Sequence, residues 1–504
     1  MSKKYVLLST LLFLASSPLF SQDGNPDISF GGNGTIQTDI SGGGGDFAYD
    51  IAQKTDGKLI VAGGVDIGNF EFIPAIVQFD TNGDLSQSFG NNGIVLRDFG
   101  TDFDFYIHVG AQSDGKVIAG GSMGPSGNKI VILNRYLENG DLDTSFGNNG
   151  DLIPFNSDNE SSAFAMLDDD SFLIANPVNN GSTIIIQLKK YLANGTLDVS
   201  FGTNGTAFIE NGGNSNAVYF IKIMTNGNMV LAGDIQSNGT YKTSLVRLLP
   251  DGSKDASFGT NGIALITEFT DFTLQSIGVY DNGNIAVLQS FYSVDPDIAQ
   301  TRVTRYTANG IFDSTFGPGG QGFIDPNIEN LVARTLLIQP NQRLLLYGEY
   351  TDFFEGGGNT FIKRYHTNGG TDDSFNITTV LNSEYFSEKM ILQEDGKLVC
   401  LGKSPWYSGD EDYVLERYNN TPLNVPEFET DSLTAFPNPA RNEVTITYNL
   451  IENTEVPYQI SDISGKLLME GKLSGRQAVI NLSALQSGLY FLNTINSTLR
   501  LVKE

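Results

Sequence analysis

The sequence predicts an all-β protein: a seven-bladed β-propeller followed by a small C-terminal β-sandwich. Two observations lead to this prediction. One unit of four strand-like segments recurs seven times, and helical periodicity is absent throughout. Glycine supplies 57 of the 504 residues, which indicates a chain with many turns. The predicted parts are a signal peptide at 1–21, the propeller at 22–420, a linker at 421–432 and the C-terminal domain at 433–504.

Each repeat carries a Ser-Phe-Gly motif or a close variant, at intervals of 55 to 59 residues. In the second unit, the strand-like segments A to D are Ile94 to Leu96, Tyr106 to Ala111, Val117 to Ala119 and Lys129 to Tyr136. Small antiparallel sheets repeated radially make a propeller. The motif phenylalanines are predicted to be structural wedges between blades. They are Phe30, Phe89, Phe146, Phe201, Phe258, Phe316 and Phe375.

A basic residue near the end of segment D precedes, by eight residues, the Asp that begins each motif. The pairs are Arg135 with Asp143, Lys190 with Asp198, Arg247 with Asp255, Arg305 with Asp313 and Arg364 with Asp372. Where the basic residue is replaced by Gln78, the acid is replaced by Ser86. We therefore expect a recurrent charge-assisted hydrogen bond. Asp27 and Arg417 remain without partners, so a closed ring predicts that they are neighbours.

The N-terminus has the features of a secretory signal. Lys3 and Lys4 precede an apolar stretch from Tyr5 to Phe20, which is too short and too interrupted to span a bilayer comfortably. We expect cleavage after Ser21 and no transmembrane segment in the mature chain. Cys400 is the only cysteine, which excludes a disulfide scaffold and a lipoprotein anchor near the cleavage point.

The C-terminal segment contains Phe436-Pro437-Asn438-Pro439-Ala440, a turn from Asp462 to Lys466, and the run Leu482 to Leu492. In these motifs it resembles, over about 70 residues, the C-terminal sorting domain of type IX secretion substrates of Gram-negative bacteria. The resemblance implies the type IX export machinery as a partner and a location outside the cell or on its outer surface. Over about 390 residues, the repeats resemble the delta-60 repeat family, whose members resemble β-propellers and supply no established activity.

Composition and spacing exclude several functions. The formal net charge of −28 disfavours nucleic acid and anionic lipid surfaces as partners. His108 and His366, the only histidines, lie in different repeats, so neither a Ser-His-Asp set nor a zinc cluster is predicted. Asp80 to Asp84 lacks the complete pattern of a calcium loop. The prediction is therefore no catalytic residue, no metal site and no cofactor, although calcium elsewhere on so acidic a surface stays open.

Strand order points to one rim of the ring as the candidate binding face. Antiparallel order places the A–B and C–D loops on one rim and the B–C and D–A connections on the other. Loops of the first rim vary in length and composition, which is typical of binding surfaces on a rigid scaffold. The candidate ligand-binding residues are Phe353, Phe354, Trp406, Tyr407, Asp352, Glu355, Asp410 and Asp412. These aromatic rings could alternatively cover blade edges.

The predicted function is a non-catalytic binding or adhesion protein, secreted or at the cell surface, that recognises a glycan or protein through this rim. Two alternatives stay open. A glycan-cleaving propeller enzyme would need two facing carboxylates about 5–10 Å apart. A structural surface-layer component would need no concave binding site.

Overall fold

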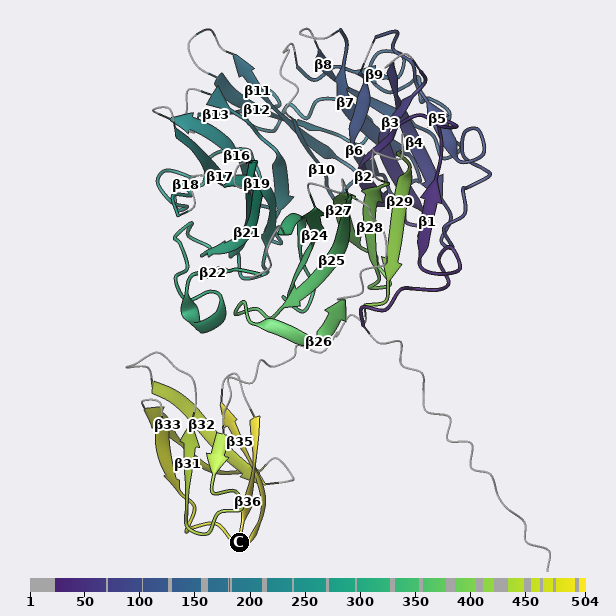
Figure 1. The fold of residues 1–504 in the computed structure, drawn as a ribbon. Helices are drawn as coiled ribbons and strands as arrows, with labels where there is room; N and C mark the ends of the chain where they lie inside the picture. The colour runs from purple at the N-terminus through teal and green to yellow at the C-terminus, as the bar shows by residue number, and fades with distance from the viewer. Residues whose placement is uncertain are drawn as a thin grey trace, which may run out of the picture. The chain divides into compact units, whose positions relative to one another are not determined.

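A computed structural model describes residues 23–504, apart from short segments drawn in grey in Figure 1. Those segments are 69–70, 102, 126–128, 156–161, 180, 182–183, 211–214, 238–239, 269–271, 295–296, 327–330, 353–356, 378–385, 405–410, 421–433, 448–454, 463–465, 475–476 and 495–497. The predicted signal peptide and linker lie outside the described residues. The chain divides into two compact units, Met1–Pro422 and Leu423–Glu504.

The first unit confirms the predicted all-β propeller. Its described residues form seven antiparallel sheets, a number compatible with seven blades, and Figure 1 shows them following one another around a ring. Because the first strands of neighbouring sheets contact each other, these strands form the inner wall.

Around the ring, the sheets follow one another in the order of the sequence. The first three sheets are β2 (Asp46–Gln53), β3 (Leu59–Asp66), β4 (Phe72–Phe79) and β5 (Ile94–Leu96); β6 (Phe105–Ala111), β7 (Val117–Met123), β8 (Ile130–Tyr136) and β9 (Asp151–Leu152); and β10 (Ala163–Met166), β11 (Phe172–Asn179), β12 (Ile184–Tyr191) and β13 (Thr206–Ile209). The fourth sheet pairs both β14 (Ser215–Asn216) and β15 (Phe220–Ile223) with β16 (Met229–Ser237), followed by β17 (Thr240–Leu248) and β18 (Ile263–Leu265). The fifth and sixth are β19 (Thr273–Val279), β20 (Ile285–Val294), β21 (Asp297–Tyr306) and β22 (Phe323–Ile324); and β23 (Leu331–Ile338), β24 (Leu344–Asp352), β25 (Gly357–Tyr365) and β26 (Thr371–Ile377). The seventh is β27 (Phe386–Leu392), β28 (Leu398–Lys403), β29 (Tyr413–Tyr418) and β1 (Thr35–Thr38).

Each blade is offset by one strand from the sequence repeat. Segment A of the second unit is β5, and it pairs with β4 of the preceding repeat rather than with a strand of its own. A blade therefore combines segments B, C and D of one repeat with segment A of the next. The last blade takes its fourth strand from the N-terminus, because β1 pairs with β29 from Thr35 opposite Glu416 to Thr38 opposite Tyr413.

The hydrophobic core lies between adjacent sheets. One cluster joins the seventh and first blades and includes Phe30, Val61 and Leu415, all fully buried. Strand β3 is buried at every position except its last, as expected for a strand covered on both faces. Cys400 in β28 is also fully buried, and burial raises the pKa of its thiol.

The repeated basic residue connects neighbouring blades. Arg247 Nε donates to Asp255 Oδ2 at 2.9 Å, and its guanidinium carbon lies 4.7 Å from the centre of the Phe258 ring. Its Nη1 donates to the carbonyl of Ala308 in the next blade. Arg135 and Arg305 make the same three contacts. The D–A connection of each of these blades is thus fastened to its neighbour.

The two ends of the propeller repeat this arrangement where the ring closes. The junction between β29 and the N-terminal segment that ends in β1 is called the seam. Arg417 Nε donates to Asp27 Oδ2 at 2.8 Å, and its guanidinium lies 4.4 Å from the centre of the Phe30 ring. Its Nη1 donates to the carbonyl of Thr81 at 2.6 Å. Both members of the pair are buried, and Lys397 Nζ lies 3.1 Å from the same Asp27 oxygen. The structure therefore places Asp27 and Arg417 side by side.

The motif glycine is required by its backbone. Gly90 has φ of 52°, and a Cβ atom there would lie 2.4 Å from the carbonyl oxygen of Ile94. Any other residue would be strained and would collide with this turn.

The C-terminal unit is a β-sandwich of two antiparallel sheets. One sheet contains β30 (Thr434–Phe436), β31 (Glu443–Thr447) and β34 (Gln477–Asn481); the other contains β33 (Leu467–Ser474), β32 (Glu455–Asp462), β35 (Gly488–Thr494) and β36 (Thr498–Lys503). Its core includes Val444, Ile460, Leu492 and Leu501.

Replacing Arg417 by Met should weaken ring closure. Met retains apolar contact with Phe30 but removes the guanidinium from the buried Asp27, whose remaining partners are Lys397 and Ser29. The free energy of unfolding should therefore fall by about 2–4 kcal/mol. Urea denaturation followed by circular dichroism measures the change. Lys190→Met is the control: Lys190 Nζ is 3.3 Å from Asp198 and more exposed, so its loss should cost less than about 1 kcal/mol. Equal effects of the two variants would contradict the assigned role of the seam.

Glu416 in β29 should make stability depend on pH. Burial raises the pKa of its carboxyl from 4.5 to about 7, against a hydrogen bond from Thr360 that lowers it. The unfolded chain therefore binds fewer protons than the folded one between these values, and stability falls as pH rises through this window. Glu416→Gln should remove the part of the fall that this carboxyl causes, raising stability above pH 7 by on the order of 1–3 kcal/mol.

Thermal unfolding at pH 5 and pH 8 measures this difference. Glu443→Gln, at an exposed position of the C-terminal unit, should behave as the unmodified protein at both pH values. A Glu416→Gln variant that loses as much stability between pH 5 and 8 as the unmodified protein would refute the assignment.

Candidate functional site

Most of the predicted ligand-binding residues lie outside the described part of the chain. Segments 353–356 and 405–410 contain Phe353, Phe354, Glu355, Trp406, Tyr407 and Asp410, and the side chain of Asp352 is likewise not described. Asp412 is described and only 6% exposed. Its carboxylate accepts a hydrogen bond from Gln37 Nε2 at 2.6 Å, which places it inside the seam between β1 and β29.

The rim that carries the A–B and C–D loops also holds five aromatic side chains, called the rim aromatic cluster: Phe47, Tyr49, Phe72, Phe103 and Phe105. Phe47 and Tyr49 lie in β2, Phe72 begins β4, Phe103 lies in the β5–β6 loop, and Phe105 begins β6. Phe103 stacks on Phe72 with ring centres 5.4 Å apart, and Phe72 packs edgewise on Phe47 at 5.3 Å. Phe103 is 45% exposed, whereas Phe72 is buried. The cluster thus presents one ring to solvent over a buried base.

The backbone of Phe103 is held in an unusual conformation. Its φ is 62°, a region that bulky residues rarely occupy. Lys129 Nζ donates to the Phe103 carbonyl, and Asp104 donates its backbone N–H to the Phe72 carbonyl at 3.1 Å. The Asp104 carboxylate accepts hydrogen bonds from Thr101 and Gly124. The surrounding loops therefore fix the conformation that exposes this ring.

Charged groups border the cluster. Lys403 Nζ lies 5.0 Å from the centre of the Phe47 ring and 3.5 Å from Glu388 Oε1. Burial raises the pKa of the carboxyls of Glu388 and Glu411. Burial, reinforced by these two carboxylates, also raises the pKa of Tyr49 to about 12. The rim therefore combines apolar rings with hydrogen-bonding groups of both charges.

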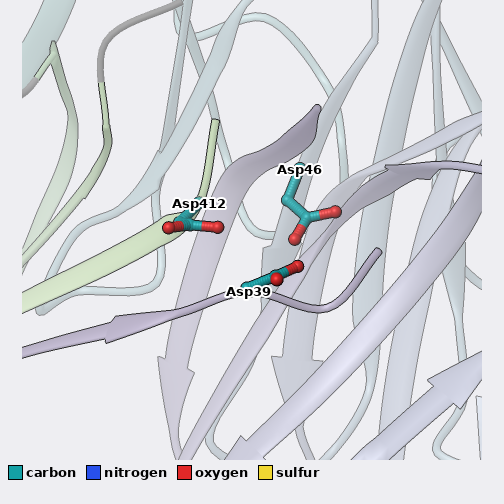
Figure 2. Close-up of side chains that lie close together, drawn as sticks. All are labelled: Asp39, Asp46 and Asp412. Carbon is teal, nitrogen blue, oxygen red and sulfur yellow. The ribbon is translucent and has the colours of Figure 1, made fainter. Parts of the chain in front are cut away.

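Three carboxylates meet where the ring closes. Asp39 follows β1, Asp46 begins β2, and Asp412 precedes β29; one oxygen of each lies within 4.8 Å of the others. Figure 2 shows the three side chains converging on one gap. Burial, with the nearby charge of Asp39, raises the pKa of Asp46 to about 7, although backbone N–H groups of Ile40 and Ser41 oppose this. All three could contribute oxygen ligands to a hard cation.

The inner wall holds a second group of ionisable side chains. Lys389 in β27 pairs with Asp50 in β2, and His108 Nε2 lies 2.9 Å from Ser162 Oγ. Burial lowers the pKa of His108 to about 4. Burial and repulsion by Lys389 lower the pKa of Lys222 to about 8. His108 therefore belongs to the lining of the ring. These neighbours could not be predicted from the sequence because they come from different blades.

A recurrent β-bulge also escaped sequence analysis. The inner strands β2, β6, β19, β23 and β27 each carry an extra residue against their partner. The extra residues are Tyr49, Ile107, Gln275, Arg334 and Glu388. Bulges redirect side chains; Tyr49 belongs to the rim aromatic cluster and Glu388 borders it.

Comparisons with known proteins address both units. Residues 434–504 match the family model of the secretion system C-terminal sorting domain. The C-terminal unit is a secretion sorting domain. Residues 112–146 and 225–258 match the model of a β-propeller domain of unknown function, in agreement with the resemblance of the repeats. The sorting domain shows that the protein is exported and is either secreted or located at the cell surface.

Solved structures resemble the fold at low identity. One is Drosophila Semaphorin 2a, which is 8% identical, with a TM-score of 0.45. The match covers 96% of this chain and 99% of the semaphorin chain. The polysaccharide lyase Uly1 is 12% identical, with a TM-score of 0.45. The match covers 81% of this chain and 94% of the lyase chain. The β-propeller domain of the Trilobed protease from Pyrococcus furiosus has 10% identity, coverages of 76% and 98%, and a TM-score of 0.40.

No curated protein matches the sequence. Among the described residues, no helix has the length and apolar character needed to cross a membrane.

Proposed function

We propose that this exported propeller is a non-catalytic binding or adhesion protein that recognises a glycan through the rim aromatic cluster. The observation that carries the proposal is Phe103, an exposed aromatic residue held at positive φ by its neighbours. Strained backbone conformations persist only where the surroundings fix them, and they concentrate at ligand-binding sites. A loop selected only for stability would place glycine at this position.

The chemistry of the rim favours a sugar as the ligand. An exposed ring supplies a flat apolar surface for one face of a pyranose, and its buried stacking partner prevents the ring from collapsing into the core. Lys403, Glu388 and Glu411 supply donors and acceptors for hydroxyl groups beside the aromatic cluster. The acidic and aromatic residues of segments 353–356 and 405–410 lie outside the described residues. Strand order predicts that they belong to loops of the same rim, and they are proposed to extend the site.

The carboxylate group of Asp39, Asp46 and Asp412, found among the described residues, does not favour the alternative of glycan cleavage. Asp39, Asp46 and Asp412 have oxygens within 4.8 Å of one another, but Asp46 is fully buried and Asp412 is 6% exposed. A general acid or nucleophile must reach the glycosidic bond. Two of these three carboxyls are shielded from any soluble substrate by their own surroundings.

Phe103→Gly should weaken glycan binding while leaving the propeller folded. Glycine accepts positive φ, so relief of strain offsets the loss of ring stacking, and stability should change by less than about 1 kcal/mol. The measurement is binding of the full-length protein to an array of bacterial and plant polysaccharides, followed by titration of each positive polysaccharide. Affinity for these should fall at least about tenfold, which corresponds to about 1.4 kcal/mol.

Phe208→Ala is the matched control, because Phe208 in β13 is a similarly exposed phenylalanine outside the cluster. It should bind as the unmodified protein does. Trp406→Ala tests the extension of the site into segment 405–410 and should also weaken binding. The proposal fails if no polysaccharide binds or if Phe103→Gly binds with unchanged affinity.

A further inference from the structure

We propose that Asp39, Asp46 and Asp412 form a calcium site that fastens the N-terminal strand into the last blade. The residues lie far apart in the sequence and meet only because β1 pairs with β29. The site shares no residue with the rim aromatic cluster, although Asp46 directly precedes Phe47, and it does not depend on the proposed glycan binding.

The geometry suits a single shared ion. Two oxygens that bind one calcium ion at about 2.4 Å can be no more than about 4.8 Å apart. The three carboxylate oxygens meet this limit pairwise, and Figure 2 shows their side chains directed at one another from three segments. Backbone hydrogen bonds hold two of them in place: Gly42 N–H donates to Asp39 Oδ1 at 2.6 Å and Ile40 N–H donates to Asp46 Oδ2 at 2.6 Å.

An unsatisfied buried oxygen points independently to a ligand. Asp46 is fully buried, yet its Oδ1 has no hydrogen-bond partner among the described residues. Buried polar atoms without a partner are rare in folded proteins because their desolvation is not offset. The hydroxyl of Tyr413, also fully buried, lacks a hydrogen-bond partner too, and it lies within electrostatic range of Asp46. A cation at this point would give the Asp46 oxygen the partner that it lacks.

The three carboxylates favour a hard divalent cation as the bound ion. All candidate ligand atoms are carboxylate oxygens, which favours calcium or magnesium over zinc or copper. Calcium accepts irregular geometry and remaining water ligands, whereas magnesium demands near-ideal octahedral coordination. Exported domains commonly bind calcium with dissociation constants of about 0.1–1 mM. Because the carboxylates come from three separate segments, we expect irregular coordination geometry, which favours calcium over magnesium.

Binding would act on closure of the ring. Asp39 lies beyond one end of β1, and Asp46 donates its backbone N–H to the carbonyl of Glu411, next to Asp412. An ion shared by these residues would link β1, β2 and the start of β29. Because the unfolded chain does not bring these carboxylates together, bound calcium stabilises only the closed form.

Calcium titration of the full-length, metal-free protein tests the proposal. Isothermal titration calorimetry with CaCl2 should show a site that is lost in Asp46→Asn and in Asp39→Asn. Asn at position 46 keeps an oxygen for the Ile40 N–H, and Asp39 is exposed, so both variants should fold, as circular dichroism verifies. In 5 mM CaCl2 the propeller's melting temperature should rise by about 2–5 °C in the unmodified protein but not in Asp46→Asn or Asp39→Asn.

Asp251→Asn is the matched control. Asp251 is an exposed turn aspartate that accepts a backbone N–H from Ser253, as Asp39 does from Gly42. This variant should keep the binding heat and the thermal shift. The proposal is overturned if the unmodified protein binds no calcium, if Asp46→Asn and Asp39→Asn retain the site, or if Asp251→Asn loses it.

Discussion

A guanidinium held by a carboxylate, a phenylalanine ring and a neighbouring carbonyl is the interaction on which the ring depends. In the fifth blade, Arg305 binds Asp313 at 2.8 Å, lies 4.4 Å from the centre of the Phe316 ring and reaches the carbonyl of Thr367 in the sixth. One side chain thereby fixes the connection between repeats and joins two blades. Repetition of this contact fastens one rim, so the loops of the opposite rim can vary without loss of the fold.

That division explains where strain is tolerated. Phe103 adopts its unfavourable φ on the variable rim, where Lys129 and Asp104 hold the loop against a neighbouring hairpin. A free loop would relax, because such a conformation costs about 1–3 kcal/mol. The arginine contacts of the opposite rim contribute to this support indirectly. They set the spacing between blades, and the loops of these blades make the contacts that hold Phe103.

The sequence predicted the ring and the neighbours Asp27 and Arg417, because the repeat left these two residues unmatched. It did not predict that β5 pairs with the preceding repeat, since the three-residue segment Ile94–Leu96 has no pairing preference of its own. Neither a bulge at Tyr49 nor the φ of Phe103 follows from residue type, because both arise from tertiary contacts. The cluster of Asp39, Asp46 and Asp412 becomes visible only once the ring is closed.

The closing strand is held differently at its two ends. Between Thr35 and Thr38, β1 makes four residue pairs with β29, so a short ladder joins residues nearly 400 positions apart. Backbone hydrogen bonds of residues 24–34 with residues 417–419 extend this contact. At one end, Arg417 and Asp27 attract each other. At the other, Asp39, Asp46 and Asp412 bring like charges together, which opposes closure. A divalent cation reverses the sign of that interaction, so both ends of the short ladder would then favour the closed ring.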